Sequence, residues 1–281
     1  MHSGIILKTP AKINIGLWIE KRRDDGYHNI KTIFVPVSIF DEVILKEAQR
    51  IICKTSIGLL PQDEKNIAHK AALEFFNYIG IKRGVYIYIK KNIPVGKGLG
   101  GGSSDAAAVI NGLCKLCKIN LSYEKRIEIA RKIGADVAFF ISPRPAIAEE
   151  RGDRLSYFKS STLHFIIFSP DFNISTSWAY SSLKHLTNAD NCIKILKERL
   201  IEGRFEGMDI CEFNSFEEIV FKRYPKLWDV KKALKEEGAY YALLSGSGSA
   251  VYGIFDKGII KPVFERIKKR FKGDWFLCKM V

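Results

Sequence analysis

The chain has 281 residues and a formal net charge of +14 at pH 7, with 47% hydrophobic and 27% charged residues. That length can bury a substantial core in one large or two smaller domains, and the composition is ordinary for a globular protein. No run approaches the roughly 18–20 apolar residues of a membrane-spanning helix, and the N-terminal residues lack a signal-peptide pattern. We therefore expect a cytoplasmic protein that does not contact membranes.

Lys and Arg residues are spread along the whole chain rather than gathered in one block. This distribution fits a solvated basic surface, or the surroundings of an anion-binding site, better than a nucleic-acid partner. The six cysteines are also scattered, and only Cys114 and Cys117 have a suggestive spacing. Because no second pair and no adjacent histidine accompany them, we expect both to be core cysteines.

Strands and helices alternate irregularly in the N-terminal half, which favours an α+β architecture over a doubly wound sheet. Strands are expected over 5–18 (broken at Pro10), 32–37, 42–45 and 85–90. Helices are expected over 66–78, capped by Asn66, over 104–118, and over 122–133, capped by Ser122 and stopped at Gly134.

The C-terminal half continues the same mixture after connectors at 143–145 and 151–161. Strands are expected over 163–168, 240–244 and 250–255, and helices over 189–202, 226–237 and 262–271. We predict two layered α+β domains, residues 1–158 and 159–281, with the boundary near 155–162.

One glycine-rich segment is the strongest motif. Five glycines fall between Gly96 and Gly102, and Ser103, Ser104, Asp105 and three alanines follow. Glycine permits positive φ and close approach to a ligand, while hydroxyls, an acid and alanines suit a helix start. The unpaired N–H groups and dipole of that helix start predict a phosphate site.

Two common phosphate motifs fit this segment poorly. The P-loop pattern fails, because Gly102 and Ser103 stand where Lys and Ser/Thr should be. A dinucleotide pattern matches at Gly96, Gly98 and Gly101, but it lies mid-chain after an aromatic-rich strand instead of after a first buried parallel strand.

The whole segment from Pro94 to Ala107 resembles the ATP loop of the GHMP small-molecule kinases, in the form typical of the 4-diphosphocytidyl-2-C-methyl-D-erythritol kinase family. The resemblance implies an ATP site with a Mg²⁺ ion that Ser103 or Ser104 would reach, and it places Asn66 near the adenine. The implied ATP-binding residues are Pro94, Val95, Gly96, Lys97, Gly98, Leu99, Gly100, Gly101, Gly102, Ser103, Ser104 and Asn66.

Near the N-terminus, Lys12 and Asn14 lie in the octet Pro10–Leu17, between small or apolar neighbours. A lone lysine is often only solvated. The octet resembles the opening motif of the same family, which implies that Lys12 acts beside the reacting hydroxyl and that Asn14 binds the substrate.

The triplet Gly26-Tyr27-His28 follows two aspartates and could be no more than a hairpin tip. It is similar to the family's cytidine-binding element, and a flat ring with a donor/acceptor side chain suits a pyrimidine. The resemblance also places a second aromatic in the segment 174–180. Tyr180 is our candidate, with Trp178 as the alternative.

Asp136 stands in the apolar stretch 134–140, where an unpaired carboxylate is costly to bury. It could be a helix cap. The resemblance instead implies a general base, although the family usually has proline where this chain has Ala138.

The run Ser245–Ser249 resembles the third GHMP motif and predicts support for the phosphate loop, unless it is a simple hairpin turn. The resemblance implies an α+β, two-domain GHMP kinase fold with an N-terminal domain like ribosomal protein S5 and a ferredoxin-like C-terminal domain.

The implied reaction is ATP-dependent phosphorylation of the 2-hydroxyl of 4-diphosphocytidyl-2-C-methyl-D-erythritol, in the non-mevalonate isoprenoid route, with Lys12 and Asp136 as catalytic residues. Alternatives are a sugar, homoserine or mevalonate kinase and, remotely, a basic nucleic-acid-binding protein. The expected partner is the small cytidyl diphosphate substrate, without nucleic acid, and the expected state is a monomer or weak homodimer.

Overall fold

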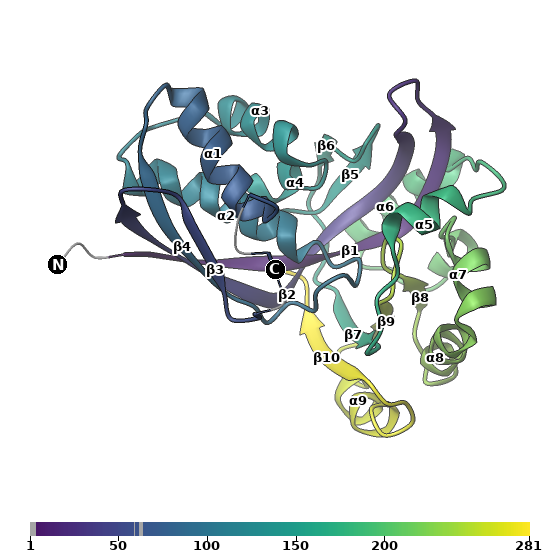
Figure 1. The fold of residues 1–281 in the computed structure, drawn as a ribbon. Helices are drawn as coiled ribbons and strands as arrows, with labels where there is room; N and C mark the ends of the chain where they lie inside the picture. The colour runs from purple at the N-terminus through teal and green to yellow at the C-terminus, as the bar shows by residue number, and fades with distance from the viewer. Residues whose placement is uncertain (1–3, 59, 62–63) are drawn as a thin grey trace. The chain divides into compact units, whose positions relative to one another are not determined.

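The computed structural model describes residues 4–58, 60–61 and 64–281 (Figure 1). Its internal contacts define two compact units, each built from separate chain segments. The first unit holds the described part of Met1–Ala11 with Ile39–Ile93 and Gly100–Pro143, and the second holds Lys12–Ser38, Pro94–Leu99 and Arg144–Val281. The predicted domains 1–158 and 159–281 stay a prediction.

In the first unit, helices cover one face of a small sheet (Figure 1). The sheet pairs residues Glu42–Ala48 of β2 (His28–Ala48) antiparallel with β4 (Gly84–Lys90), and β3 (Ile52–Thr55) lies parallel to β4. The long strands β1 (Ile5–Arg22) and β2 pair with each other, and each contributes residues to both units.

The helices of this unit are α1 (Ile67–Ile79), α2 (Gly101–Leu116), α3 (Tyr123–Ile133) and α4 (Val137–Ile141). Helix α1 turns a stripe of alanines and phenylalanines inward, which is the spacing of an amphipathic helix. Helix α2 approaches the strands closely at Gly112, where an added Cβ would lie 2.4 Å from Leu45 and 2.8 Å from Leu7.

The second unit is built on a four-stranded antiparallel sheet in the order β10 (Asp274–Lys279), β7 (His164–Ser169), β9 (Val251–Phe255) and β8 (Tyr241–Leu244). Residues Thr32–Phe34 of β2 pair with β5 (Ala146–Glu149), which pairs with β6 (Arg154–Tyr157). The helices are α5 (Thr176–Ser181), α6 (Asp190–Glu202), the 3-10 helix η1 (Met208–Cys211), α7 (Glu217–Arg223), α8 (Pro225–Glu236) and α9 (Ile260–Ile267).

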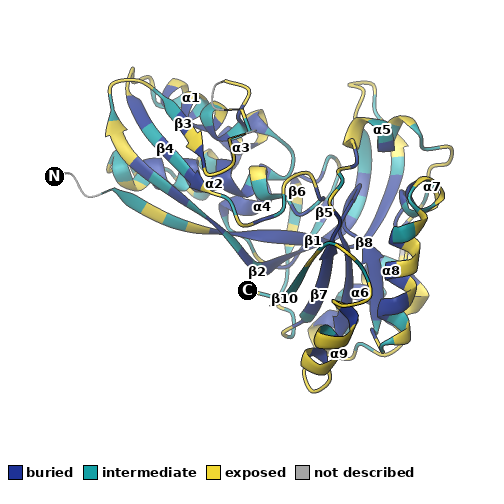
Figure 2. Ribbon diagram, turned by 60° about the horizontal axis from the view of Figure 1, so that its bottom comes forward, coloured by how far each residue is buried: buried dark blue, intermediate teal, exposed yellow. Residues whose placement is uncertain are grey.

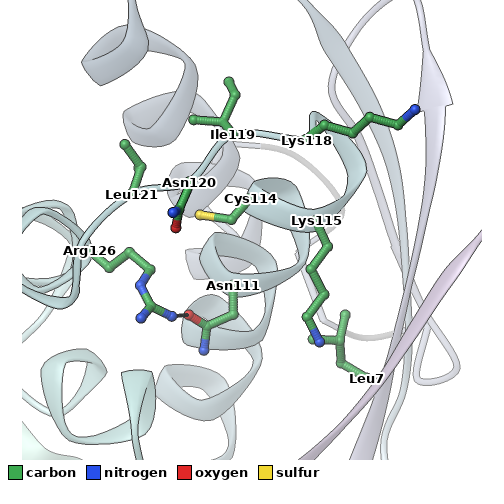
Figure 3. A pocket seen from close by; sticks show the side chains of 9 residues that line it. All are labelled: Leu7, Asn111, Cys114, Lys115, Lys118, Ile119, Asn120, Leu121 and Arg126. Carbon is green, nitrogen blue, oxygen red and sulfur yellow. Dashed lines mark hydrogen bonds between the residues drawn. The ribbon is translucent and has the colours of Figure 1, made fainter.

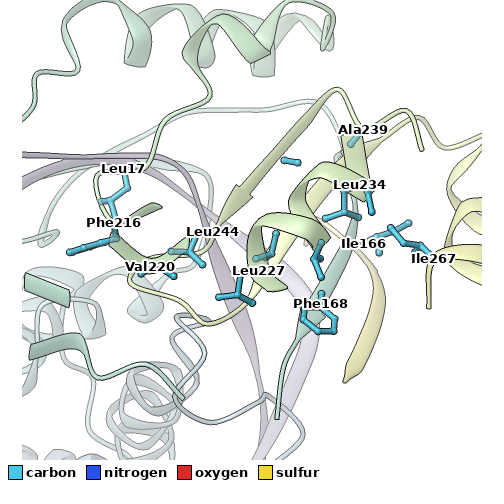
Figure 4. Packing of buried hydrophobic residues seen from close by; sticks show 14 of the residues in the cluster. Leu17, Ile166, Phe168, Phe216, Val220, Leu227, Leu234, Ala239, Leu244 and Ile267 are labelled. Atoms are coloured by element: carbon cyan, nitrogen blue, oxygen red, sulfur yellow. The ribbon is translucent and has the colours of Figure 1, made fainter. Parts of the chain in front are cut away.

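The core of the second unit lies between this sheet and its helices (Figure 4). Sheet residues such as Phe168 and Leu244 pack with Val220, Leu227 and Ile267 from α7, α8 and α9. In Figure 2 the strands β7, β8 and β9 are largely buried, while β10 and α9 show exposed residues. None of the helices within the described residues is long and apolar enough to cross a membrane.

Two partly buried glutamates cover the outer side of β8, the last strand of that sheet. Glu212 accepts a hydrogen bond from the Ala242 N–H at 3.0 Å, and Glu217 accepts one from the Leu244 N–H at 2.9 Å. Lys231 links the two carboxylates, at 3.2 Å from Glu212 and 2.7 Å from Glu217.

Several predicted elements are confirmed, including the Asn66 and Ser122 caps and the end of α3 at Gly134. The predicted break at Pro10 is wrong, because β1 runs through it. Proline lacks only the N–H donor, and the Pro10 carbonyl still accepts a hydrogen bond from the Ser104 hydroxyl at 2.6 Å. The two strands expected within 32–45 form the single strand β2.

Other boundaries differ because tertiary contacts override local preference. Helix α2 begins at Gly101 instead of Ser104, the expected connector 151–161 contains β6, and α9 ends at Ile267 instead of 271. The elements β3, α4, β5, α5, η1, α7 and β10 were not predicted. Cys114 and Cys117 are half-buried, so the expectation that they are core cysteines is wrong.

Candidate active site

The predicted phosphate loop is shaped by glycines in the left-handed region. Gly98 has φ of +76°, and a Cβ added there would lie 2.0 Å from the Ser245 carbonyl oxygen. The Ser245 hydroxyl donates to the Gly98 carbonyl at 3.1 Å. The glycine loop that begins at Gly96 and the run Ser245–Ser249, the two glycine-serine runs, therefore lie against each other, as the sequence predicted. There is no room for a side chain between them at Gly98.

The other residues of the loop up to Leu99 fall into two groups. Lys97 and Leu99 are buried, and they hold the loop: the Lys97 ammonium donates to the Phe172 carbonyl at 2.6 Å, and the Leu99 carbonyl accepts from the Lys12 N–H at 2.9 Å. Burial lowers the pKa of Lys97. Pro94 is half-buried, and Val95 and Gly96 are exposed.

The start of α2 separates the two candidate serines. Gly100, in the left-handed region at φ +72°, is the N-cap and has no side chain to cap the helix. Ser104 is fully buried, and its hydroxyl contacts Thr9 and donates to the Pro10 carbonyl. Ser103 is half-buried and precedes it in the first turn, with Gly101 and the exposed Gly102. Of the two serines, Ser103 is thus the less buried, and a contact with Mg²⁺ stays a prediction.

Lys12 is 4% exposed, so the alternative of a solvated lysine is wrong. Its ammonium donates to the Asn14 side-chain oxygen at 2.5 Å and lies 5.1 Å from the centre of the Phe34 ring. Asn14 donates in turn to the Thr32 hydroxyl at 3.1 Å. The amide and the aromatic face hold the buried ammonium in a fixed position, so its positive charge is preorganised.

Tyr27, His28 and Tyr180 lie in the second unit. Tyr27 is 57% exposed beyond a turn in which its N–H donates to Asp25 at 3.1 Å, so the hairpin-tip description also holds. The His28 ring stacks on Tyr180 with centroids 5.1 Å apart. Burial lowers the pKa of His28, and Arg22 lowers it further, which favours the neutral imidazole at pH 7.

The alternative aromatic, Trp178, is engaged elsewhere. Its ring lies under the Arg223 guanidinium at 4.6 Å and meets Tyr224 edge-on, with centroids 6.2 Å apart. Of the two candidates, Tyr180 is the one paired with His28.

Asp136 and Asn66 lie in the first unit. Asp136 is half-buried at the N-cap position of α4, yet its side chain makes no capping hydrogen bond, so the helix-cap alternative does not describe it. Asn66 accepts from the Ala68 N–H at 2.9 Å and donates to the Pro61 carbonyl at 2.7 Å. Its amide is therefore engaged in shaping the chain before α1, and its adenine contact stays a prediction.

Comparison with known proteins decides the family. The GHMP kinases N terminal domain matches residues 66–144, and the GHMP kinases C terminal domain matches residues 193–273. The 4-diphosphocytidyl-2-C-methyl-D-erythritol kinase of Thermodesulfovibrio yellowstonii is 38% identical over 98% of this chain and 96% of its own length. The protein of the same name from Syntrophomonas wolfei is 39% identical over 91% of this chain and 90% of its own. The chain belongs to the 4-diphosphocytidyl-2-C-methyl-D-erythritol kinase family.

Solved structures agree with this assignment. A crystal structure of 4-(cytidine 5'-diphospho)-2C-methyl-D-erythritol kinase has a TM-score of 0.83 and 30% identity, covering 98% of this chain and 99% of that one. Homoserine kinase from Cytophaga hutchinsonii has a TM-score of 0.82 at 20% identity, which shows the fold alone. The predicted α+β, two-domain GHMP kinase fold is confirmed, and the protein is an ATP-dependent phosphotransferase.

Sequence reasoning missed several side chains that shape the kinase's loops. Asn173 packs against Gly96, where an added Cβ would lie 2.9 Å away. Asn214 donates to the carbonyls of Leu244 and Gly246, both at 2.8 Å, and so fixes the start of the second glycine-serine run. Tertiary packing sets the positions of Asn173 and Asn214. The sequence offered at most one hint, an asparagine next to a predicted loop.

The far end of α2 carries a cavity of about 480 Å³ that includes Cys114, Lys115, Lys118 and Arg126 (Figure 3). The Lys118 side chain points away from Arg126, and Arg126 donates to Asn111 at 2.8 Å (Figure 3). Burial raises the pKa of the Cys114 thiol. The basic groups do not converge, and this cavity adds nothing to the kinase site.

Proposed function

We propose that this kinase transfers the γ-phosphoryl group of ATP to the 2-hydroxyl of 4-diphosphocytidyl-2-C-methyl-D-erythritol, in the non-mevalonate isoprenoid route. The observation that carries the substrate assignment is the aromatic pair His28 and Tyr180, stacked 5.1 Å apart beside the exposed Tyr27. Flat rings of this kind bind a pyrimidine by stacking, and the neutral His28 adds a hydrogen-bonding edge.

The glycine loop and the start of α2 fit the triphosphate of ATP. Gly98 has a positive φ and no space for a Cβ, so the loop presents backbone groups rather than a side chain at this position. The sixteen-residue helix α2 begins without a side-chain cap, so its first N–H groups suit phosphate oxygens. Bound Mg²⁺ neutralises phosphate charge during transfer, and Ser103 is the hydroxyl that would reach it.

In the proposed reaction, Asp136 orients the substrate hydroxyl and accepts its proton. Lys12 supplies positive charge that steadies negative charge as it develops on the transferring group. The Asn14 and Phe34 contacts hold the Lys12 ammonium in one position before the substrate arrives, which lowers the reorganisation needed in the transition state.

The remaining GHMP kinases are the main alternative. The homoserine and mevalonate kinases that share this fold are 20% and 16% identical to the chain, so they support no substrate assignment. The stacked pair of His28 and Tyr180, with the exposed Tyr27 next to His28 in the sequence, favours a nucleotide-bearing alcohol over a small, polar one. A monomer or weak homodimer in the cytoplasm is the setting that we propose.

The decisive assay is ADP release on a panel of alcohols that includes the cytidyl substrate, homoserine, mevalonate and galactose. We expect turnover with the cytidyl substrate alone, and preference for any other alcohol would overturn the assignment. Asp136→Asn should lower the single-turnover rate at least about 100-fold, the usual scale of general base catalysis. Tyr27→Ala should raise KM for the cytidyl substrate far more than KM for ATP, whereas equal effects would contradict its role.

A further inference from the structure

We propose that a buried ionic cluster, Asp41, Lys91 and Asp105, fixes both ends of the glycine loop, and that Asp105 is a positioning residue for nucleotide binding. The inference rests on the proposed role of this loop in holding ATP. None of the three side chains belongs to the phosphate-contacting set described above, and each acts through the backbone it holds.

The cluster is built around the Lys91 ammonium. It contacts an Asp41 oxygen and lies 2.7 Å from an Asp105 oxygen. The three side chains are 3%, 0% and 4% exposed for Lys91, Asp41 and Asp105, so water screens none of these contacts. All three residues belong to the first unit.

The entry to the loop is held by Asp41. Its second oxygen accepts the N–H groups of Asn92 at 2.6 Å and Ile93 at 2.8 Å, the two residues directly before Pro94. Two backbone donors on one carboxylate oxygen fix the direction of the chain as it leaves β4.

The exit from the loop is held by Asp105, in the second turn of α2. The same helix also touches the cluster at Gly101, where an added Cβ would lie 3.2 Å from the Lys91 ammonium and 3.0 Å from Ile93. Lys91 thus joins the chain before the loop to the helix after it, fourteen positions further on.

A buried cluster of this kind is poorly explained by stability alone, since apolar residues of similar volume often stabilise a protein as well or better. One Asp105 oxygen is buried without a hydrogen-bond partner among the described groups. Burial raises the pKa of Asp105, so the cluster carries a proton in place of a second full negative charge. The charged groups instead fix the position of one loop end relative to the other. Lys91 can contact both carboxyl groups only when the chain before the loop and the helix after it lie in this arrangement.

The test compares Asp105→Ala, which removes the group that accepts from Lys91, with Asn111→Ala. Both residues lie on α2, but Asn111 lies toward its far end and donates to the Ile141 carbonyl at 3.1 Å. We expect Asp105→Ala to weaken binding of a fluorescent ATP analogue about tenfold and to raise KM for ATP, while KM for the cytidyl substrate stays within about twofold, since loop misplacement acts on the nucleotide alone. Asn111→Ala should lower the melting temperature without changing either KM.

Equal changes in both KM values, or nucleotide binding by Asp105→Ala as tight as in the wild type, would overturn the inference. Failure of the wild-type protein to bind the ATP analogue would instead overturn the proposed function, so the two failures are distinguishable. If Asp105→Ala does not fold, Lys91→Arg keeps the charge but changes its reach, and the same split between the two KM values is expected. Unaltered nucleotide affinity in Lys91→Arg would contradict a role of the cluster in nucleotide binding.

Discussion

The ring of His28 lies almost flat on the ring of Tyr180, with the planes 29° apart. These residues are separated by most of the chain, yet both belong to the second unit, where Tyr180 also meets Phe216 edge-on with centroids 4.9 Å apart. The pair is braced from behind by the hydrophobic core, and a base that stacks here meets a surface already in place. This preorganisation lowers the cost of binding.

Replacing Tyr180 tests that surface. Tyr180→Ala should raise KM for the cytidyl substrate about tenfold or more, because stacking of a base on an aromatic ring contributes about 1–3 kcal/mol. Steady-state kinetics with each substrate varied in turn measure the effect, and KM for ATP should hardly change. Trp178→Ala serves as the matched aromatic control, since Trp178 packs on Arg223 and Tyr224. A larger effect of Trp178→Ala on KM for the cytidyl substrate would assign the stacking role to Trp178 instead of Tyr180.

Gly98 is the position where the loop tolerates no side chain. Gly98→Ala combines an unfavourable φ with a Cβ only 2.0 Å from the Ser245 carbonyl, so the two runs must separate and KM for ATP should rise at least about tenfold. Gly80→Ala is the control: its φ is +70°, but nothing lies within 4 Å of the added Cβ. That variant should lose about 1–2 kcal/mol of unfolding free energy in a urea titration and keep its kinetics. Equal kinetic damage from both would contradict a role for the Gly98–Ser245 contact.

The two serines at the start of α2 should respond differently to alanine. Ser104→Ala removes the donor to the Pro10 carbonyl in a fully buried site, which should cost about 1–3 kcal/mol of unfolding free energy. Ser103→Ala should leave stability nearly unchanged but raise the Mg²⁺ concentration needed for half-maximal velocity. A magnesium titration of both variants, beside their urea curves, separates the roles, and a raised Mg²⁺ requirement in Ser104→Ala alone would reverse them.

Asp105 should make stability depend on pH in an unusual direction. Burial raises its folded-state pKa above 3.8, Asp41 raises it further, and Lys91 opposes both. From about pH 4 upward the unfolded chain has lost a proton that native Asp105 still holds, so unfolding releases a proton and this group's contribution to stability falls as pH rises. The wild type should therefore lose up to about 1.4 kcal/mol per pH unit relative to Asp105→Asn between about pH 5 and pH 7. The measurement is the free energy of unfolding of both proteins as a function of pH. Parallel curves over this range would exclude a raised pKa for the Asp105 carboxyl.

Local signals in the sequence were sufficient for some elements and not for others. The Asn66 and Ser122 caps were predictable because the capping side chain and its helix are neighbours in sequence. The start of α2 was placed at Ser104, since serine and aspartate favour helix starts. The structure starts it three residues earlier, at Gly101, after an N-cap glycine that has no side chain to signal a cap.

The same distinction applies to the site. Glycine patterns pointed to the loop, and the family resemblance with apolar neighbours pointed to Lys12, which the structure shows to be buried. Asp41 and Lys91 gave no signal, because charged residues in a strand and at its end usually face water. Their burial depends on partners 14 and 50 positions away. Cooperative ionic contacts of this kind arise only when the chain is folded.

The glutamates beside β8 have a consequence for self-association. An outermost strand normally offers its outward N–H groups to any extended segment, including a second copy of the same strand. Here the Ala242 and Leu244 donors are already used by Glu212 and Glu217, and Lys231 holds both acids in place. Growth of this sheet by strand addition would have to break those bonds first, so contact between copies is directed away from this edge.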